Sequence, residues 1–188
     1  MAVPWIGIRS PWCGGSGSFA PVRAVNEADL RESFVNCSKG DRARLALPGA
    51  LADIDFEQLD FLGRRDPKAP ERAYIVTDTD AGLVGIVLRA APKSAKILSR
   101  SSMCSVCLTP HASSGVALLS APLAGASGRN GNSAGIYMCA DLQCSRYVRG
   151  TLKSEAIMPM AETIDPAAKI DRLRQRLEAF VARIGGTA

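Results

Sequence analysis

The chain has 188 residues, of which 47% are apolar, so it can form one domain with a buried core and is not globally disordered. None of its apolar runs approaches the roughly 20 residues that a helix needs to span a bilayer, and no membrane partner is expected. The net charge of +5 is a mild basic excess, which fits an acidic protein partner or a nucleic acid and selects neither.

The first 24 residues are predicted to form a flexible N-terminal tail, because the run GGSGS at 14–18 is typical of a linker. This segment contains no unbroken apolar stretch of signal-peptide length. Four of the six cysteines of the chain fall into two close pairs, as expected for a metal site in a reducing compartment. A cytoplasmic location is therefore expected.

The first predicted helix begins at Asn26, a residue type that caps helices. Leu30, Phe34 and Cys37 then recur at helical spacing, and Gly40 is expected to end the helix. We assign Cys37 to the core, since a cysteine without a close second cysteine is a poor metal ligand.

Residues 41–70 are predicted to be rich in loops, because prolines and glycines interrupt short apolar pieces. Residues 73–76 and 83–88 are apolar runs that flank the turn-forming sequence DTDAG at 78–82, a pattern that predicts a β-hairpin. The expected fold is therefore α+β, with a small antiparallel sheet and flanking helices.

The most informative residues are two cysteine pairs, Cys104 with Cys107 and Cys139 with Cys144, separated by 31 residues. Zinc takes four soft or borderline ligands at the corners of a tetrahedron, and a pair with two intervening residues offers both sulfurs from one tight turn. We predict one structural Zn²⁺ ion held by these four cysteines. A redox-active dithiol and reduced core cysteines are the alternatives.

The second pair requires a change of backbone direction, because five positions along a helix cannot place both sulfurs on one side. We expect Asp141 to cap a helix, with Cys144 in its first turn and Cys139 on the preceding strand. Residues 116–119 and 134–138 are predicted strands around a loop at 125–132. Knuckle, hairpin and helix are the order of a treble-clef zinc finger, which would occupy about residues 102–150.

His111 is the single histidine of the chain and lies four residues after Cys107. It is predicted to be exposed or to support the site, with replacement of one cysteine ligand as the alternative. Four thiolates would leave no open position for a catalytic water, and one histidine makes a Ser-His-Asp or Cys-His arrangement hard to build. The chain is therefore not expected to be an enzyme.

The last predicted element is an amphipathic helix at about residues 165–184, with Asp165 as its cap and Pro166 at its first position. Its apolar stripe is expected to pack on its own domain, and Gly185 and Gly186 are expected to end it.

Several runs of the sequence resemble the C-terminal treble-clef zinc-finger domain of elongation-factor-G-binding proteins, which are the FusB-type fusidic-acid-resistance proteins and their relatives. These runs are SFVNCSKG at 33–40, LDFLG at 59–63 with DP at 66–67, CSVCLT at 104–109, GRNGNS at 128–133 and CADLQCSRYVRG at 139–150. The similarity spans about residues 25–184, so residues 25–188 are taken as one domain of this type.

The resemblance implies that the zinc is structural and that Cys104, Cys107, Cys139 and Cys144 bind it. It also implies that the protein binds elongation factor G on or near the ribosome and helps to release it, without making or breaking a bond. Full-length resistance proteins carry a helical bundle ahead of this domain, and residues 1–24 are too short to supply one. Factor binding is therefore expected, whereas drug resistance is not implied.

Five residues of the metal module are candidate partner-binding residues: Arg129 and Asn130 in the hairpin loop, and Arg146, Tyr147 and Arg149 on the helix. Solvated charge or support of the zinc thiolates is an equally weighted interpretation of the arginines. The alternative function is RNA or DNA binding, for which Lys93, Lys96 and Arg100 would extend the basic face and Tyr137 and Tyr147 would stack on bases.

Overall fold

The computed structural model describes residues 22–80, 82–92, 102–155 and 162–186. Its main element is an antiparallel five-stranded sheet with the strand order β1-β2-β3-β6-β7. The strands are β1 (Leu62–Arg65), β2 (Arg72–Thr79), β3 (Gly82–Ala90), β6 (Val116–Pro122) and β7 (Ser133–Cys139). The short strands β4 (Ser102–Met103) and β5 (Pro110–His111) pair separately.

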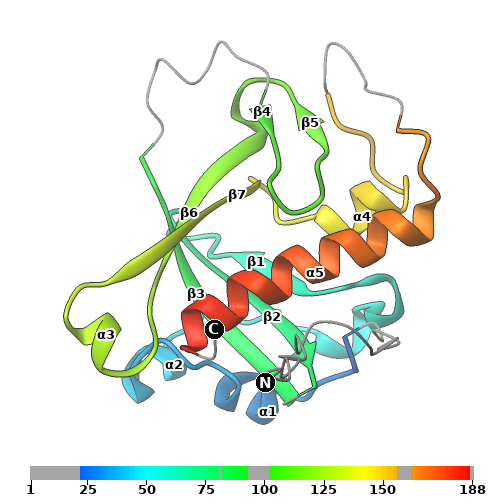
Figure 1. Ribbon diagram of the computed structural model, residues 1–188. Helices are drawn as coiled ribbons and strands as arrows, with labels where there is room; N and C mark the ends of the chain where they lie inside the picture. The colour runs from blue at the N-terminus through cyan, green and yellow to red at the C-terminus, as the bar shows by residue number, and fades with distance from the viewer. Residues whose placement is uncertain (1–21, 81, 93–101, 156–161, 187–188) are drawn as a thin grey trace, which may run out of the picture.

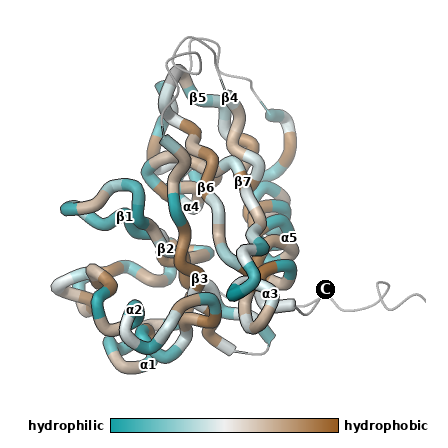
Figure 2. The backbone as a smooth tube through the Cα atoms, turned by 90° about the vertical axis from the view of Figure 1, so that its left-hand side faces the viewer, coloured by the Kyte–Doolittle hydropathy of each residue, from teal (hydrophilic) through white to brown (hydrophobic). Residues whose placement is uncertain are grey.

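The hairpin predicted around residues 78–82 is confirmed as β2 and β3, which pair from Thr79 opposite Gly82 to Arg72 opposite Arg89. Gly82 has a φ of +109°, a conformation that a residue with a side chain rarely adopts. Both faces of these central strands are covered, and Figure 2 shows the most hydrophobic stretch of the backbone along β3. This explains why their sequences are continuous apolar runs rather than an alternation.

The sheet narrows between β3 and β6, which share only the pairs of Arg89 with Ser120 and of Ala90 with Leu119. From there β6 and β7 run as a long hairpin, whose far end carries α3 (Gly125–Arg129; Figure 1). The loop predicted at 125–132 is therefore partly helical. Gly128 permits this turn, because a Cβ atom at that position would lie 1.7 Å from the Leu123 carbonyl oxygen.

One face of the sheet is covered by α5 (Pro166–Gly185), the long helix that crosses Figure 1. It begins as predicted, since the Asp165 side chain accepts a hydrogen bond from the Ala167 N–H, and it ends at Gly186 in the left-handed conformation. Its apolar stripe packs on its own domain, as expected. The first core lies between this helix and the sheet and includes Leu173, Leu177, Ile184, Ile75, Ile86, Leu119, Met138 and the four paired cysteines.

The opposite face is covered by α1 (Glu27–Glu32), α2 (Lys39–Ala43) and two 3-10 helices, Leu51–Asp53 and Phe56–Gln58. The second core lies between these segments and the strands β1 and β2. Its buried members are Val22, Val25, Leu30, Phe34, Phe56, Leu62, Tyr74 and Val76.

The single helix predicted from Asn26 to Gly40 is wrong in its extent. Asn26 does cap α1, but the helix ends at Glu32 and Phe34 forms a parallel bridge with Gly85. A Cβ atom at Gly85 would lie 2.8 Å from the Phe34 ring, so the missing side chain allows this bridge. Gly40 consequently lies inside α2, which begins after the cap residue Ser38.

Most of the predicted N-terminal tail, residues 1–21, lies outside the described residues. Val22 is buried in the second core and its N–H donates a hydrogen bond to the Leu59 carbonyl. Residues 22–24 therefore belong to the folded part of the chain rather than to a tail. Among the described helices, none combines the length and the hydrophobicity needed to cross a membrane.

Candidate metal centre

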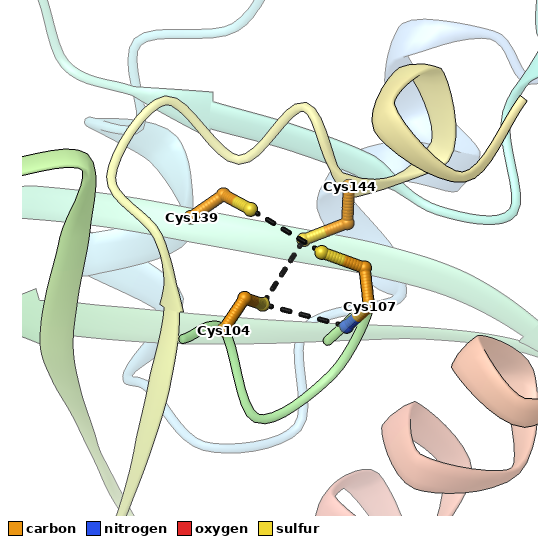
Figure 3. A group of neighbouring side chains, drawn as sticks. All are labelled: Cys104, Cys107, Cys139 and Cys144. Atoms are coloured by element: carbon orange, nitrogen blue, oxygen red, sulfur yellow. Dashed lines mark hydrogen bonds between the residues drawn. The ribbon is translucent and has the colours of Figure 1, made fainter. Parts of the chain in front are cut away.

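Three separate segments bring the four paired cysteines together (Figure 3). Cys104 and Cys107 come from the turn after β4, Cys139 is the last residue of β7, and Cys144 is the first residue of α4 (Cys144–Val148). Their sulfur atoms all lie within 4.8 Å of one another and all four residues are buried. The Cys104 and Cys144 sulfurs are 3.7 Å apart, and those of Cys107 and Cys139 are 3.4 Å apart.

These distances fit a single zinc ion. A Zn–S bond of about 2.3 Å in tetrahedral geometry places sulfur atoms about 3.8 Å apart. The two sulfur–sulfur separations lie close to this value, and the sulfurs are not joined as disulfides. The four side chains converge on one point in Figure 3. The cluster can hold one tetrahedral ion and, once it does, has no unused corner for a water.

The turn that holds the first pair has the geometry of a zinc knuckle. The N–H groups of Val106 and Cys107 both point at the Cys104 sulfur, at 3.4 Å each. Leu108 closes the turn with an N–H donated to the Cys104 carbonyl and has a φ of +60°. A leucine rarely takes this left-handed conformation, which costs of order 1 kcal/mol and is kept where the surroundings fix the backbone.

The second pair is held by a different turn from the one predicted. Asp141 does not cap the helix: its carboxylate accepts hydrogen bonds from the Gln143 N–H and from the Tyr147 hydroxyl. The helix begins only after Gln143, which places Cys144 at its first position. Leu142, with a φ of +61°, turns the chain between the Asp141 carboxylate and Gln143. The predicted reversal between Cys139 and Cys144 is present, but an aspartate-closed turn makes it.

His111 lies beside the cluster and is buried. Its Nε2 atom is 3.2 Å from the Cys139 sulfur, and its ring packs edge-on against Tyr147 with the ring centres 4.8 Å apart. Gly115 makes room for the ring, since a Cβ atom there would lie 2.6 Å from the His111 Cβ. Burial lowers the pKa of His111, which favours the neutral imidazole. Of the two positions predicted for this histidine, exposed or supporting, the structure shows the supporting one.

The electrostatics of the cluster call for a cation. Hydrogen bonds from the Cys107, Cys139 and Cys144 thiols lower the pKa of Cys104, while the same sharing with Cys104 raises the pKa of Cys139 and of Cys144. Ionising Cys139 and Cys144 beside the Cys104 sulfur is therefore unfavourable in the absence of a cation. A bound dication would stabilise the remaining thiolates, which is the chemistry that zinc supplies.

The candidate partner-binding residues do not form one surface. Arg146 is exposed on α4 and Tyr147 is half-buried beside His111. Arg129 and Asn130 are exposed at α3, which precedes β7, whereas Cys139 ends it. The length of this strand, about 20 Å, separates the two groups (Figure 1).

Arg149 forms an ion pair within the fold, which the sequence did not indicate. It is paired with Asp60, whose side chain is fully buried, and the same carboxylate accepts a hydrogen bond of 2.7 Å from the Arg174 Nε. Ser145 adds a hydroxyl that accepts the Asp60 N–H. This ion-paired group joins α4 and α5 to the segment before β1, so Arg149 holds the metal module on the sheet.

The sheet, the knuckle and the buried cysteine cluster define the chain as a treble-clef zinc-finger protein. The family described as FBP C-terminal treble-clef zinc-finger matches residues 29–184, which include all four cysteines. The chain belongs to this family, and the resemblance found in its sequence is confirmed.

Among solved structures, the chain is similar to the one described as the fusidic acid resistance protein FusC. The TM-score is 0.52 and the sequence identity 16%, over 87% of this chain and 59% of that chain. This likeness shows a shared fold, and the chain spans 59% of the length of FusC. No curated protein sequence matches the chain significantly.

Proposed function

We propose that the chain is a non-catalytic zinc-stabilised module that binds elongation factor G and promotes its release from the ribosome. The observation that carries this proposal is the family match over residues 29–184, together with the cluster of four buried cysteines. We further propose that Cys104, Cys107, Cys139 and Cys144 are the zinc ligands. A binder of this kind acts by linkage: it stabilises one state of its partner and so shifts the population of states.

The surface around α4 supports a docking role. Arg146 lies at a recess of about 560 Å³ whose other walls include Pro48, Ile54 and Leu59. Polar residues such as Asp55 and Gln58 also line this recess, and an exposed arginine at a hollow of this kind is a residue type that often contributes strongly to binding. Arg149 would act there indirectly, because its ion pair with Asp60 positions α4.

A second group of candidate residues, Arg129 and Asn130, is exposed at α3. A partner of ordinary interface size contacts about 800 Å² of each protein, a patch about 30 Å across, so one partner can span the length of β7 but need not contact both groups. Each group is therefore tested separately.

Titration of the zinc-loaded chain with purified elongation factor G, followed by calorimetry, tests the binding. We expect a complex with a Kd of about 10 µM or tighter, and weaker binding by about tenfold for Arg146→Ala or Arg129→Ala. Arg183→Ala is the matched control, since Arg183 is exposed on α5 and belongs to neither group. The absence of binding at tens of micromolar would remove the proposal.

Release is tested on ribosomes to which fusidic acid has locked the factor. Added chain should move the factor from the ribosome pellet to the supernatant, whereas a chain that binds without release would leave the pellet unchanged. The alternative function, nucleic-acid binding, is tested by titrating the chain with ribosomal RNA. A nucleic-acid binder would show an affinity for the RNA that falls steeply with salt. This alternative has less support, because Arg149 is paired with Asp60 and Tyr147 packs against His111 and hydrogen-bonds to Asp141. Lys93, Lys96 and Arg100 lie outside the described residues.

A further inference from the structure

A second recess lies on the face of the sheet opposite α5, between the central strands and the segment that contains α2. Its volume is about 340 Å³, near the lower end of the range for small-molecule sites. Its walls include Arg72, Tyr74 and Arg89 from the strands, and Arg44 and Leu45 from the α2 segment. None of the four paired cysteines and none of the candidate partner-binding residues lines it.

Two arginines face each other in this recess. Arg72 on β2 and Arg89 on β3 are directly opposite in the strand register, both exposed, and like charges in that relationship destabilise a sheet. Glu71 lies 4.0 Å from Arg72 and is itself exposed, and no acidic residue in the described part of the chain pairs with Arg89. Two aspartates also line the recess: Asp41 is paired with Arg44 at 2.7 Å, and Asp66 accepts a hydrogen bond from the Lys68 N–H. Three arginines against two aspartates leave the recess with a net excess of positive charge, located where the two strands meet.

Tyr74 supplies an unused hydrogen-bond donor. Tyr74 lies two residues after Arg72 on the same face of β2, opposite Val87, and is 3% exposed. Its buried hydroxyl makes no hydrogen bond to the described protein atoms. Burial also raises the pKa of Tyr74 well above its ordinary value, although the nearby Arg64 and Arg31 oppose this, so the hydroxyl stays protonated. A buried donor without an acceptor costs about 1–3 kcal/mol, which an oxygen of a ligand or water recovers.

The floor of the recess is held rigidly. The Asn36 side chain donates hydrogen bonds of 3.0 Å to the carbonyls of Val87 and Pro122 and accepts one of 2.8 Å from the Val87 N–H. The amide thus fixes the α2 segment against both β3 and the end of β6. A site that is already ordered loses less entropy when a ligand binds.

We propose that this recess binds a small organic phosphate, with the phosphoryl group between Arg72 and Arg89 and the organic part against Leu45, Ala46 and Val87. A phosphoryl group has three terminal oxygens, enough to accept from two guanidiniums and one further donor, and arginine binds it in a bidentate manner. The volume suits a small molecule and is too small for a nucleic-acid strand. The site stands independently of the factor-binding role.

The test uses the zinc-loaded full chain and three probes: phenyl phosphate, inorganic phosphate and benzoate. Amide NMR shifts and calorimetry should show saturable binding of phenyl phosphate, with shifts at Arg72, Val87 and Arg89, and weaker binding of the other two probes. Arg72→Gln and Arg89→Gln should each weaken phenyl phosphate by about tenfold. Arg183→Gln, which removes an equal charge from the exposed surface of α5, should not.

Tyr74→Phe separates a binding role from a structural one. Removing an unsatisfied buried hydroxyl should leave the thermal midpoint of the ligand-free chain unchanged or higher, while phenyl phosphate binds more weakly. Three results would each overturn the proposal: no saturable shifts at about 10 mM probe, an equal loss in Arg183→Gln, or tighter binding of an acidic peptide such as hexaglutamate than of phenyl phosphate at the same amides.

Discussion

The Nε2 atom of His111 lies 3.2 Å from the sulfur of Cys139. His111 belongs to β5 and Cys139 ends β7, so this contact joins the knuckle half of the metal module to the hairpin half. Tyr147 packs edge-on against the imidazole and donates a hydrogen bond from its hydroxyl to Asp141. A side chain that contacts a metal-binding sulfur from a buried position orients that ligand and tunes its charge.

Replacing His111 with alanine should therefore lower the affinity for zinc by about tenfold or more, without changing the donor set. Competition with a chromogenic chelator measures the affinity, and the absorption spectrum of the cobalt-substituted chain reports the donors. His111→Gln, which keeps a side-chain N–H, is the matched control and should lose less. A changed cobalt spectrum in His111→Ala would instead show that His111 itself binds the metal.

Zinc removal should unfold the module. The cluster belongs to the first core, so a chelator exposes four buried sulfurs and the core around them. Structural zinc contributes about 10 kcal/mol or more in small zinc fingers, as much as the whole stability of a typical domain. We expect one zinc per chain by elemental analysis and a large fall in the thermal midpoint after chelation.

Alkylation gives the complementary measurement. In the loaded chain the four cluster cysteines should resist iodoacetamide, while the half-buried Cys37, which is outside the cluster, serves as the internal reference. Chelator should make all four reactive. Reactive cluster cysteines before chelation would favour the thiol–disulfide alternative.

The sequence predicted those elements whose signals are local. Two close cysteine pairs indicate a metal site by their spacing alone, and α5 is marked by its cap residue Asp165 and a continuous apolar stripe. The hairpin of β2 and β3 was equally clear, because apolar runs flank a short polar turn.

What the sequence could not predict depends on contacts between distant residues. The first helix ends early because Phe34 bridges to Gly85, about 50 residues away, and helical periodicity contains no trace of that contact. The hydrogen bond from Arg149 to Asp60 spans 89 residues, so no local feature of the sequence distinguishes Arg149 from an exposed interface arginine. The sequence could not choose between an exposed and a supporting His111 for the same reason, since the contact with Cys139 spans 28 residues.

Replacing Asp60 with asparagine should destabilise the fold strongly. Its side chain is fully buried between the guanidiniums of Arg149 and Arg174, and the amide would leave both positive charges beside each other without the carboxylate. Losing one member of a buried ion-paired group costs about 3–5 kcal/mol. Urea unfolding of zinc-loaded protein measures this cost, with Asp171→Asn on the exposed side of α5 as the control. A loss below about 1 kcal/mol would show that the group is not important for stability.

Glu162 should make a smaller, pH-dependent contribution to the free energy of unfolding. Its carboxylate accepts two hydrogen bonds of 2.9 Å from Arg172 and lies 3.7 Å from the Lys169 Nζ, and the Arg172 contact is the main cause of its lowered pKa. Because the folded-state pKa lies below the unfolded value, the stabilisation is present above the unfolded pKa and is lost as the pH falls through the folded pKa.

Glu162→Gln should therefore be less stable than the parent by about 0.5 kcal/mol at neutral pH, since the pair is partly exposed. The difference should shrink as the pH falls through the lowered folded-state pKa of Glu162 and disappear below it, where the parent carboxylate is protonated as well. Acid also releases zinc, but it does so from both proteins, so the difference between them at each pH isolates the carboxylate. A difference that persists unchanged at low pH would show that glutamine disturbs packing near the start of α5 rather than removing a charge.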